Sequence, residues 1–273
     1  MSGKLYVVGT PIGNLGDLSP RALETLENAD FIAAEDTRVT LKLLNRFGLK
    51  KEMISYFEHN KGFKGDIIID RILKGEICAL VSDAGMPAIS DPGEDLVREC
   101  RQADIEIESV PGPTAVATAL SISGFPTKRF CFEGFLSVDK NARREHLEEI
   151  KAEKRTMVFY EAPHKLKATL KDMLETLGNR EIAIVKELTK IYEDVFITTF
   201  EDALKYYDEN PPKGEFVVII KGANEEKQTY TIEDAVKIAK GLMAKGESAS
   251  FSAKESAKIT GIKKGDIYKE ILN

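Results

Sequence analysis

The sequence predicts an α/β protein with two α/β domains and a small helical domain at its C-terminal end. Short apolar segments alternate with helical segments along most of the chain, the pattern restarts after Phe125-Pro126, and the last part shows no strand pattern. At 273 residues the chain exceeds one average domain. We therefore expect domains at residues 1–124, 125–222 and 229–273.

In the first domain, helix boundary signals separate five apolar segments. Ser19-Pro20 and Asp91-Pro92 match the N-cap and first position of a helix, and Gly48 matches a C-terminal cap. This alternation predicts crossover units and a largely parallel sheet. The expected strands are 5–8, 31–34, 53–56, 77–81 and 105–109, and the expected helices are 19–28, 39–47, 66–73, 91–102 and 114–122.

The second domain continues the alternation, but little or no helix separates residues 187 and 194. A connection that short predicts an antiparallel edge. The expected strands are 129–135, 156–161, 182–187, 194–199 and 215–221, and the expected helices are 142–154, 165–177 and 201–207.

A polar linker at 222–228 leads to helices expected at 231–244 and 252–259. Ser252 with Glu255 predicts a capping box. The spacing around Gly261 is typical of a helix-turn-helix, and a helical hairpin packed on the main body is the alternative.

Composition limits the function classes. The chain is 42% hydrophobic and 31% charged, which is typical of a soluble globular protein. No apolar run reaches the roughly 18 residues that a membrane span needs, so we expect no membrane association and no signal peptide. Cys78, Cys100 and Cys131 are odd in number and widely spaced, which favours reduced thiols in the cytoplasm. A net charge of -6 argues against nonspecific nucleic-acid binding but allows a local basic patch.

Three stiff loops follow strands of the first sheet: residues 9–17, 82–93 and 110–115. Glycine and proline fix their conformation, and the second contains Ser-Asp-Ala-Gly and Ser-Asp-Pro-Gly. The first loop lacks the spacing of a dinucleotide fingerprint and of a P-loop. Because ligands bind beyond the carboxyl ends of such strands, we expect the three loops to line one cleft.

Charged residues also end several strands. Glu35-Asp36-Thr37-Arg38 follows one strand, and a bracing pair of Asp36 with Arg38 is as consistent with the pattern as catalysis. In the second domain, residues 160–164 and 186–190 could close the other side of the cleft. Three histidines and scattered cysteines offer no metal-ligand spacing, so no metal is expected.

Together these motifs resemble the tetrapyrrole methylase family, in particular its branch that acts on ribosomal RNA. The likeness covers roughly residues 4–222, and Lys165 stands where relatives often carry arginine. The matching motifs are Gly-Thr-Pro-Ile-Gly-Asn-Leu-Gly-Asp at 9–17, Glu-Asp-Thr-Arg at 35–38, the whole of 82–93, Val-Pro-Gly-Pro-Thr-Ala at 110–115, Phe-Tyr-Glu-Ala-Pro-His at 159–164 and Lys-Glu-Leu-Thr at 186–189.

The resemblance implies two α/β domains of the tetrapyrrole methylase type with the active site in the cleft between them. It implies S-adenosylmethionine (AdoMet) as cofactor, a homodimer, and methyl transfer to the ribose 2′-hydroxyl of a cytidine in the decoding region of 16S rRNA or the 30S subunit. A methylase of a tetrapyrrole or other small molecule and a non-catalytic RNA-binding assembly factor are the alternatives.

Carried over to this sequence, the resemblance assigns two groups of residues. The implied cofactor contacts are Pro11, Asp83, Gly85, Met86, Pro87, Ile89, Thr114, Ala115, Tyr160, Leu188 and Glu215. The candidates for a catalytic base or an orienting role are Asp36, Arg38, Lys186 and Glu187.

Overall fold

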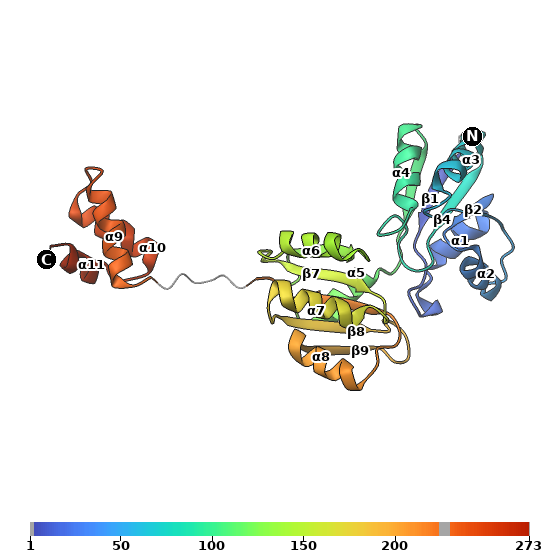
Figure 1. Ribbon diagram of the computed structural model, residues 1–273. Coiled ribbons are helices and arrows are strands. Elements are labelled where there is room, and N and C mark those ends of the chain that lie inside the picture. Colours follow the sequence, from blue (N-terminus) through green and yellow to red (C-terminus); the bar gives the residue numbers. More distant parts are fainter. Residues whose placement is uncertain (1–2, 224–229, 273) are drawn as a thin grey trace. The chain divides into compact units, whose positions relative to one another are not determined.

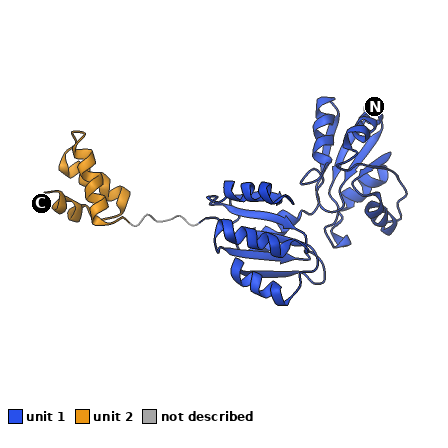
Figure 2. Ribbon diagram, in the orientation of Figure 1, with its two compact units in different colours: residues 1–223 blue, residues 224–273 orange. Residues whose placement is uncertain are grey.

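A computed structural model describes residues 3–223 and 230–272 of the chain. It divides into two compact units, residues 1–223 (unit 1) and residues 224–273 (unit 2), coloured separately in Figure 2. In the described ranges, unit 1 contains two five-stranded sheets and unit 2 contains three helices. Most of the linker predicted at 222–228 lies outside the described residues.

The first sheet, predicted to be largely parallel, is entirely parallel and has the order β3-β2-β4-β1-β5. Figure 1 labels its strands β1, β2 and β4. All five strands carry buried apolar residues, although in β5 only Val110 is buried, as expected for a sheet covered on both faces. Its strands are β1 (Lys4–Val8), β2 (Phe31–Ala34), β3 (Glu52–Ser55), β4 (Ile77–Val81) and β5 (Glu106–Val110).

Two pairs of helices cover this sheet. On one face, Leu26 and Leu44 pack with Ile32, and on the other Ile68 and Leu96 belong to a second apolar cluster. A short 3-10 turn, Leu15–Asp17, follows β1. The helices are α1 (Pro20–Asn28) and α2 (Thr37–Arg46) on the first face, and α3 (Lys61–Leu73) and α4 (Gly93–Gln102) on the second.

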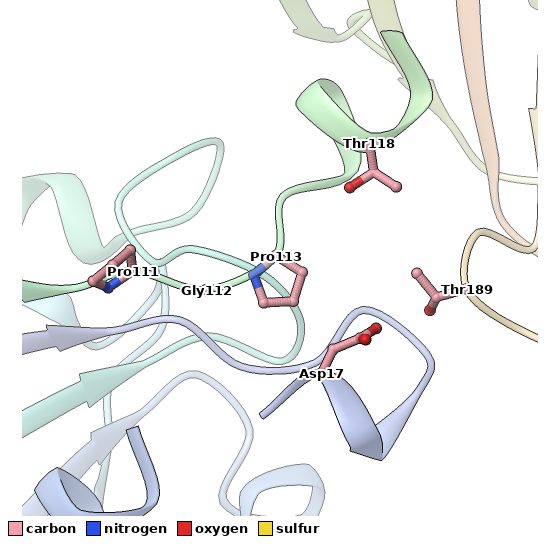
Figure 3. A pocket seen from close by; sticks show the side chains of 6 residues that line it. All are labelled: Asp17, Pro111, Gly112, Pro113, Thr118 and Thr189. Atoms are coloured by element: carbon pink, nitrogen blue, oxygen red, sulfur yellow. The ribbon is translucent and has the colours of Figure 1, made fainter. Parts of the chain in front are cut away.

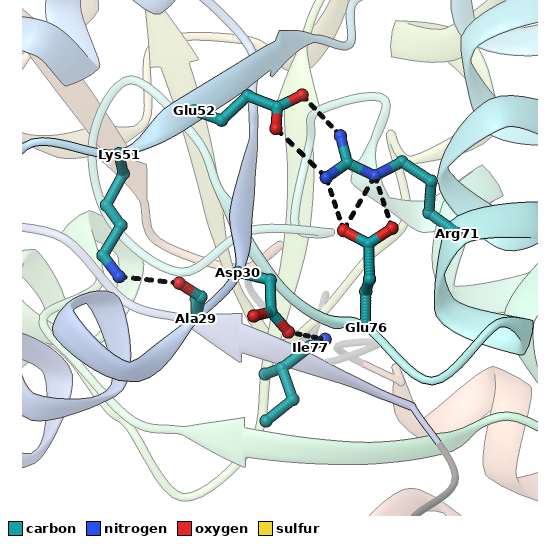
Figure 4. Close-up of polar contacts among 7 residues, drawn as sticks. All are labelled: Ala29, Asp30, Lys51, Glu52, Arg71, Glu76 and Ile77. Carbon is teal, nitrogen blue, oxygen red and sulfur yellow. Dashed lines mark hydrogen bonds and ion pairs between the residues drawn. The ribbon is translucent and has the colours of Figure 1, made fainter.

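An arginine ties α3 to the start of two strands. The Arg71 guanidinium donates hydrogen bonds to the carboxylates of both Glu52 and Glu76 (Figure 4). Its carbon also lies 3.9 Å from the ring centre of Phe31. This network lies at the amino ends of β2, β3 and β4, away from the loops predicted to bind a ligand. It stabilises the scaffold rather than the site.

The second sheet is mixed, with the order β6-β7-β10-β8-β9. Only β6 and β7 pair in parallel, and β10 runs antiparallel to both of its neighbours. The predicted antiparallel edge is confirmed, because β9 pairs antiparallel with β8. The strands are β6 (Phe130–Phe135), β7 (Thr156–Glu161), β8 (Glu181–Lys186), β9 (Asp194–Thr199) and β10 (Phe216–Ile220).

Helices cover both faces of this sheet as well. On one face lie α6 (Lys140–Glu149), α7 (Leu166–Leu177) and α8 (Phe200–Glu209). On the other face α5 (Ala115–Ser123) packs Val116 and Leu120 against apolar residues of β7, β8 and β10. The chain therefore passes from the first sheet to the second before α5. The domain boundary that the sequence analysis places after residue 124 stays a prediction.

Several helix starts differ from the sequence prediction because caps decide them. α2 begins at Thr37 instead of residue 39, since the Asp36 carboxylate accepts the backbone N–H of Arg38 and acts as N-cap. α4 begins at Gly93 with Pro92 as N-cap, whereas the sequence predicted Asp91 as N-cap and Pro92 as the first helical residue; Asp91 still accepts the N–H of Gly93 at 2.8 Å.

Unit 2 consists of α9 (Ile232–Met243), α10 (Ala249–Thr260) and α11 (Lys264–Leu272) around a small core. The predicted capping box at Ser252 is wrong. Ser252 is fully buried within α10, which Ser248 caps, and the box instead joins Thr231 with Asp234. Gly261, in the left-handed region at φ 73°, ends α10, and a short turn leads to α11.

The helices of the described ranges are all too short or too polar to cross a membrane.

Candidate functional site

Three loops meet at the carboxyl ends of β1, β4 and β5, as the sequence predicts. Thr10 and Gly85 exchange two backbone hydrogen bonds of 2.9 and 3.1 Å, which join the first loop to the second. Gly9 and Gly112 touch so closely that a Cβ on Gly112 would lie 2.8 Å from the backbone of Gly9. The Gly112 N–H also donates to the sulfur of Met86 at 3.2 Å. The loops thus form one interlocked surface.

This surface faces a cavity of about 390 Å³, within the size range of small-molecule sites. Residues of both sheets line it, because the carboxyl ends of β7 and β8 and the start of β10 meet there. The lining residues are Ile12, Glu35, Ser82, Asp83, Ala84, Gly85, Met86, Ile89, Ser90, Asp91, Thr114, Ala115, Phe135, Tyr160, Glu161, Ala162, Pro163, Val185, Leu188, Glu215, Phe216 and Val217.

Two loops around the cavity hold non-glycine residues in the left-handed region. Ala88 and Ser90 have φ of 66° and 67°, and Glu187 and Thr189 have φ of 51° and 64°. Such conformations cost free energy and persist where the surrounding structure fixes them, often at ligand sites. Four of the five such residues in the described ranges lie in these two loops.

The charge of the lining is one-sided. Glu35, Asp83, Asp91, Glu161 and Glu215 contribute carboxylates, whereas no lysine, arginine or histidine of the described residues lines the cavity. A cavity of this kind disfavours phosphate and favours a cationic ligand.

Burial raises the pKa of two of these carboxylates. Desolvation raises the pKa of Glu35, although the hydrogen bond from the Asp83 N–H opposes it and neighbouring carboxylates add to it. Desolvation also raises the pKa of Asp83, against the hydrogen bond that it accepts from the Asp36 N–H. The two carboxylates therefore link the ends of β2 and β4 through backbone hydrogen bonds.

Nine of the eleven predicted cofactor residues line the cavity, and Pro11 and Pro87 do not. Each of these prolines adjoins a lining residue, Ile12 and Met86 respectively. The nine are Asp83, Gly85, Met86, Ile89, Thr114, Ala115, Tyr160, Leu188 and Glu215.

None of the four predicted catalytic residues lies in the lining. Asp36 is the N-cap of α2, and its two carboxylate oxygens accept hydrogen bonds from Nε and Nη2 of Arg38. These hydrogen bonds lower the pKa of Asp36 to about 2. Lys186 ends β8. These positions surround the cavity without facing it.

Glu187 braces the second-sheet side. Its carboxylate accepts hydrogen bonds of 3.0 Å from the Glu215 N–H and from Lys190, whose ammonium also pairs with Glu215. Desolvation raises the pKa of Glu187, but these hydrogen bonds and the nearby lysines outweigh it and lower the pKa overall.

Sequence reasoning missed several lining residues. Glu35 adjoins Asp36, which was predicted as catalytic, and Glu161 lies in the Phe-Tyr-Glu-Ala-Pro-His motif, so the sequence offered a reason to select both. Phe135 and Phe216 carried none, because only the assembly of the second sheet brings them to the cavity.

A second, open hollow of about 460 Å³ lies beside Pro113 on the first and third loops. The carboxylate of Asp17 and the side chains of Thr118 and Thr189 surround an open space there (Figure 3). It shares no lining residue with the main cavity.

The described residues contain no group of three side chains that could hold a metal ion. Burial raises the pKa of Cys78 and of Cys100, the latter to about 11, so both thiols are protonated.

Two five-stranded sheets enclose a cavity beyond their strand ends, lined by loops that glycine and proline fix, and this arrangement is typical of an α/β protein that binds a small molecule. The family model of the tetrapyrrole (corrin/porphyrin) methylases matches residues 4–204, and the chain belongs to this family.

Relatives carry a more particular name. A protein of Synechocystis sp. called ribosomal RNA small subunit methyltransferase I is 45% identical over 268 residues, covering 97% of this chain and 96% of the relative. A protein of the same name from Thermotoga maritima is 46% identical over 220 residues, covering 81% of this chain and 99% of that shorter protein.

The fold is shared with a solved uroporphyrin-III-C-methyltransferase from Thermus thermophilus. Its TM-score is 0.57 at 23% identity, over 80% of this chain and 94% of that one.

AdoMet is the cofactor of this family, and the residues present fit it. AdoMet carries an activated methyl group on a sulfonium cation, together with an ammonium group, a carboxylate and a flat adenine, so its net charge is positive. The carboxylates of the lining suit the cations. Tyr160, Leu188 and Val217 offer an apolar surface to the adenine.

Proposed function

We propose that this chain transfers a methyl group from AdoMet to the ribose 2′-hydroxyl of a cytidine in the decoding region of 16S rRNA. The acidic cavity enclosed by both sheets, to which no described residue contributes a cationic side chain, is the observation that carries the methyltransferase part of this proposal. The name of the relatives supports the RNA substrate. A homodimer in the cytoplasm and the 30S subunit as substrate form part of the same proposal.

The eleven predicted cofactor residues keep their proposed role. Nine face the cavity, while Pro11 and Pro87 hold the loops that present Ile12 and Met86. The interlocked loops fix the cofactor in place before the RNA binds, so little entropy has to be lost to align the methyl group with the hydroxyl.

Asp36, Arg38, Lys186 and Glu187 act in this proposal as orienting residues. The Asp36–Arg38 pair fixes the turn from β2 to α2, which presents Glu35 to the cavity. Glu187 fixes the start of β10, where Glu215 lies. The side chain of Arg38 is 86% exposed and could meet an RNA phosphate.

Methylation assays with two acceptors test the proposal. Purified protein, AdoMet carrying a labelled methyl group and unmodified 30S subunits should give labelled 16S rRNA, whereas uroporphyrinogen should stay unlabelled. Label in uroporphyrinogen alone would establish a small-molecule methylase. No label in either acceptor, with AdoMet bound, would favour a non-catalytic RNA-binding assembly factor.

Deleting residues 224–273 should reduce rRNA methylation but leave AdoMet affinity unchanged. The whole cavity lies in unit 1, and the Thermotoga maritima relative is a shorter protein of the same name. Unit 2 instead exposes Lys254, Lys258, Lys264 and Lys269, which suit phosphate contacts. The measurement is kcat/KM on 30S subunits beside calorimetry with AdoMet; equal loss of both would show that unit 2 supports the fold of unit 1.

A further inference from the structure

Glu35 occupies a special position among the lining residues. It is the first residue after β2, its side chain is half-buried, and it lines the cavity. One carboxylate oxygen accepts the N–H of Asp83 at 3.3 Å. Within the described ranges, no other hydrogen bond and no ion pair engages this carboxylate.

The other four lining carboxylates already have stronger partners. Asp91 accepts hydrogen bonds from the N–H groups of Ala88 and Gly93, and Glu161 accepts them from the N–H of Ala162 and the hydroxyl of Thr169. Glu215 pairs with the ammonium of Lys190. Asp83 accepts the N–H of Asp36 at 3.0 Å. Glu35 accepts one hydrogen bond, longer than those of the other four, so its carboxylate keeps accepting capacity for a ligand in the cavity.

Its surroundings raise the pKa of this carboxylate above its ordinary value, which makes its deprotonated form a stronger base. Burial is the largest cause of the raised pKa, and Asp83, Asp91 and Asp36 add to it. The guanidinium of Arg38 is neutralised by Asp36. The titratable groups that share the cavity with Glu35 are Asp83 and Asp91 on the loop after β4, Tyr160 and Glu161 on β7, and Glu215 before β10.

We propose that Glu35 is the general base that removes the proton from the ribose 2′-hydroxyl. This inference rests on the proposed function and adds the residue that performs its proton transfer. The hydroxyl oxygen forms a bond to the methyl carbon while the carbon–sulfur bond breaks and its electron pair stays on sulfur. The hydroxyl proton passes to the Glu35 carboxylate, so charge and atoms balance. Asp83 is a positioning residue that holds Glu35 through its backbone N–H.

The central experiment is single-turnover methylation of 30S subunits by Glu35→Gln at saturating AdoMet. A general base contributes about 10²- to 10⁴-fold, so the rate should fall by about 100-fold or more. Glu24→Gln, the same change on the exposed side of α1, should match the wild type. Affinity for S-adenosylhomocysteine, measured by calorimetry, should stay within about threefold of the wild type in both variants.

The pH profile adds a readout that a structural role would not give. The base acts when deprotonated, so the wild-type rate should fall about tenfold per pH unit below the raised pKa of Glu35. Asp83→Asn removes a neighbouring negative charge and should move this acid limb to lower pH. Glu35→Gln should lose the limb. The pKa itself is measurable by ¹³C NMR of labelled glutamate carboxyls in the S-adenosylhomocysteine complex, where Glu35→Gln identifies the resonance.

Each result decides between defined alternatives. A wild type that methylates 30S subunits beside an equally active Glu35→Gln overturns the role of Glu35 and leaves the proposed function standing. A tenfold or greater loss of AdoMet affinity with retained S-adenosylhomocysteine affinity and an unchanged rate at saturation would make Glu35 a sulfonium ligand, which also overturns it. A wild type inactive on 30S subunits contradicts the proposed function instead.

Discussion

Replacing Gly85 with valine is expected to abolish AdoMet binding while the protein stays folded. Gly85 has φ 86°, a conformation that costs an L-residue about 1–2 kcal/mol and a β-branched residue more. A Cβ there would already touch Ile12 and Pro113 at 3.4 and 3.5 Å, and the valine methyl groups would reach further. Gly85 lines the cavity and pairs with Thr10. Any backbone shift that relieves this strain must therefore move the loops that line the cavity.

Gly178→Val provides the matched control for Gly85→Val. Gly178 has φ 78° at the end of α7, and a Cβ there would meet nothing within 4 Å. At φ 78° and ψ 175°, a conformation that is almost confined to glycine, this variant should bear strong backbone strain of its own and still keep its AdoMet affinity. Calorimetry measures the AdoMet affinity of each variant, and circular dichroism shows whether the variant is folded. Wild-type affinity in a folded Gly85→Val protein would remove the 82–93 loop from the cofactor site.

Replacing Gly9 with alanine should weaken AdoMet binding about 5- to 150-fold. The added Cβ would lie 2.6 Å from the backbone of Gly112 and 2.7 Å from the sulfur of Met86, so two loops must separate. Overpacking of this kind costs about 1–3 kcal/mol, and each 1.4 kcal/mol is tenfold in affinity. The loss should appear in AdoMet binding because the first, second and third loops all line the cavity.

For Gly9→Ala, the comparison is Gly62→Ala within α3, where a Cβ enters open space. That variant should bind AdoMet like the wild type and be as stable or slightly more stable. Should Gly9→Ala bind AdoMet normally and lose only thermal stability, the contact of Gly9 with Gly112 would be structural and not part of the site.

The loops that line the cavity on the side of the first sheet were largely predictable from sequence because their cause is local. Glycine and proline fix the loops after β1, β4 and β5, and parallel strands bring such loops to one edge of the sheet. Nine of eleven predicted residues accordingly line the cavity. The parallel first sheet and the antiparallel edge of the second followed from the same local spacing of apolar segments.

The choice between Glu35 and Asp36 could not be made from sequence. Two consecutive acidic residues end a strand, and which one faces the cavity depends on where the next helix begins. With the helix expected at residue 39, Asp36 was free to act. Its role as N-cap of α2 instead directs its carboxylate to Arg38 and leaves Glu35 in the cavity.

Residues from the second sheet depend on tertiary pairing. Phe216 lines the cavity because β10 lies between β7 and β8, an order that the sequence does not encode locally. In unit 2, the choice of Ser252 over Ser248 as N-cap failed for a related reason: Ser252 is buried inside α10, which begins earlier than its apolar pattern indicates.

Mass spectrometry of 16S rRNA from a strain that lacks this protein tests the proposed function most directly. The expected result is the loss of one 2′-O-methyl group from a cytidine in the decoding region, restored by the wild-type gene but not by Gly85→Val. A 16S rRNA whose methylation is the same with and without the protein would contradict the proposed function.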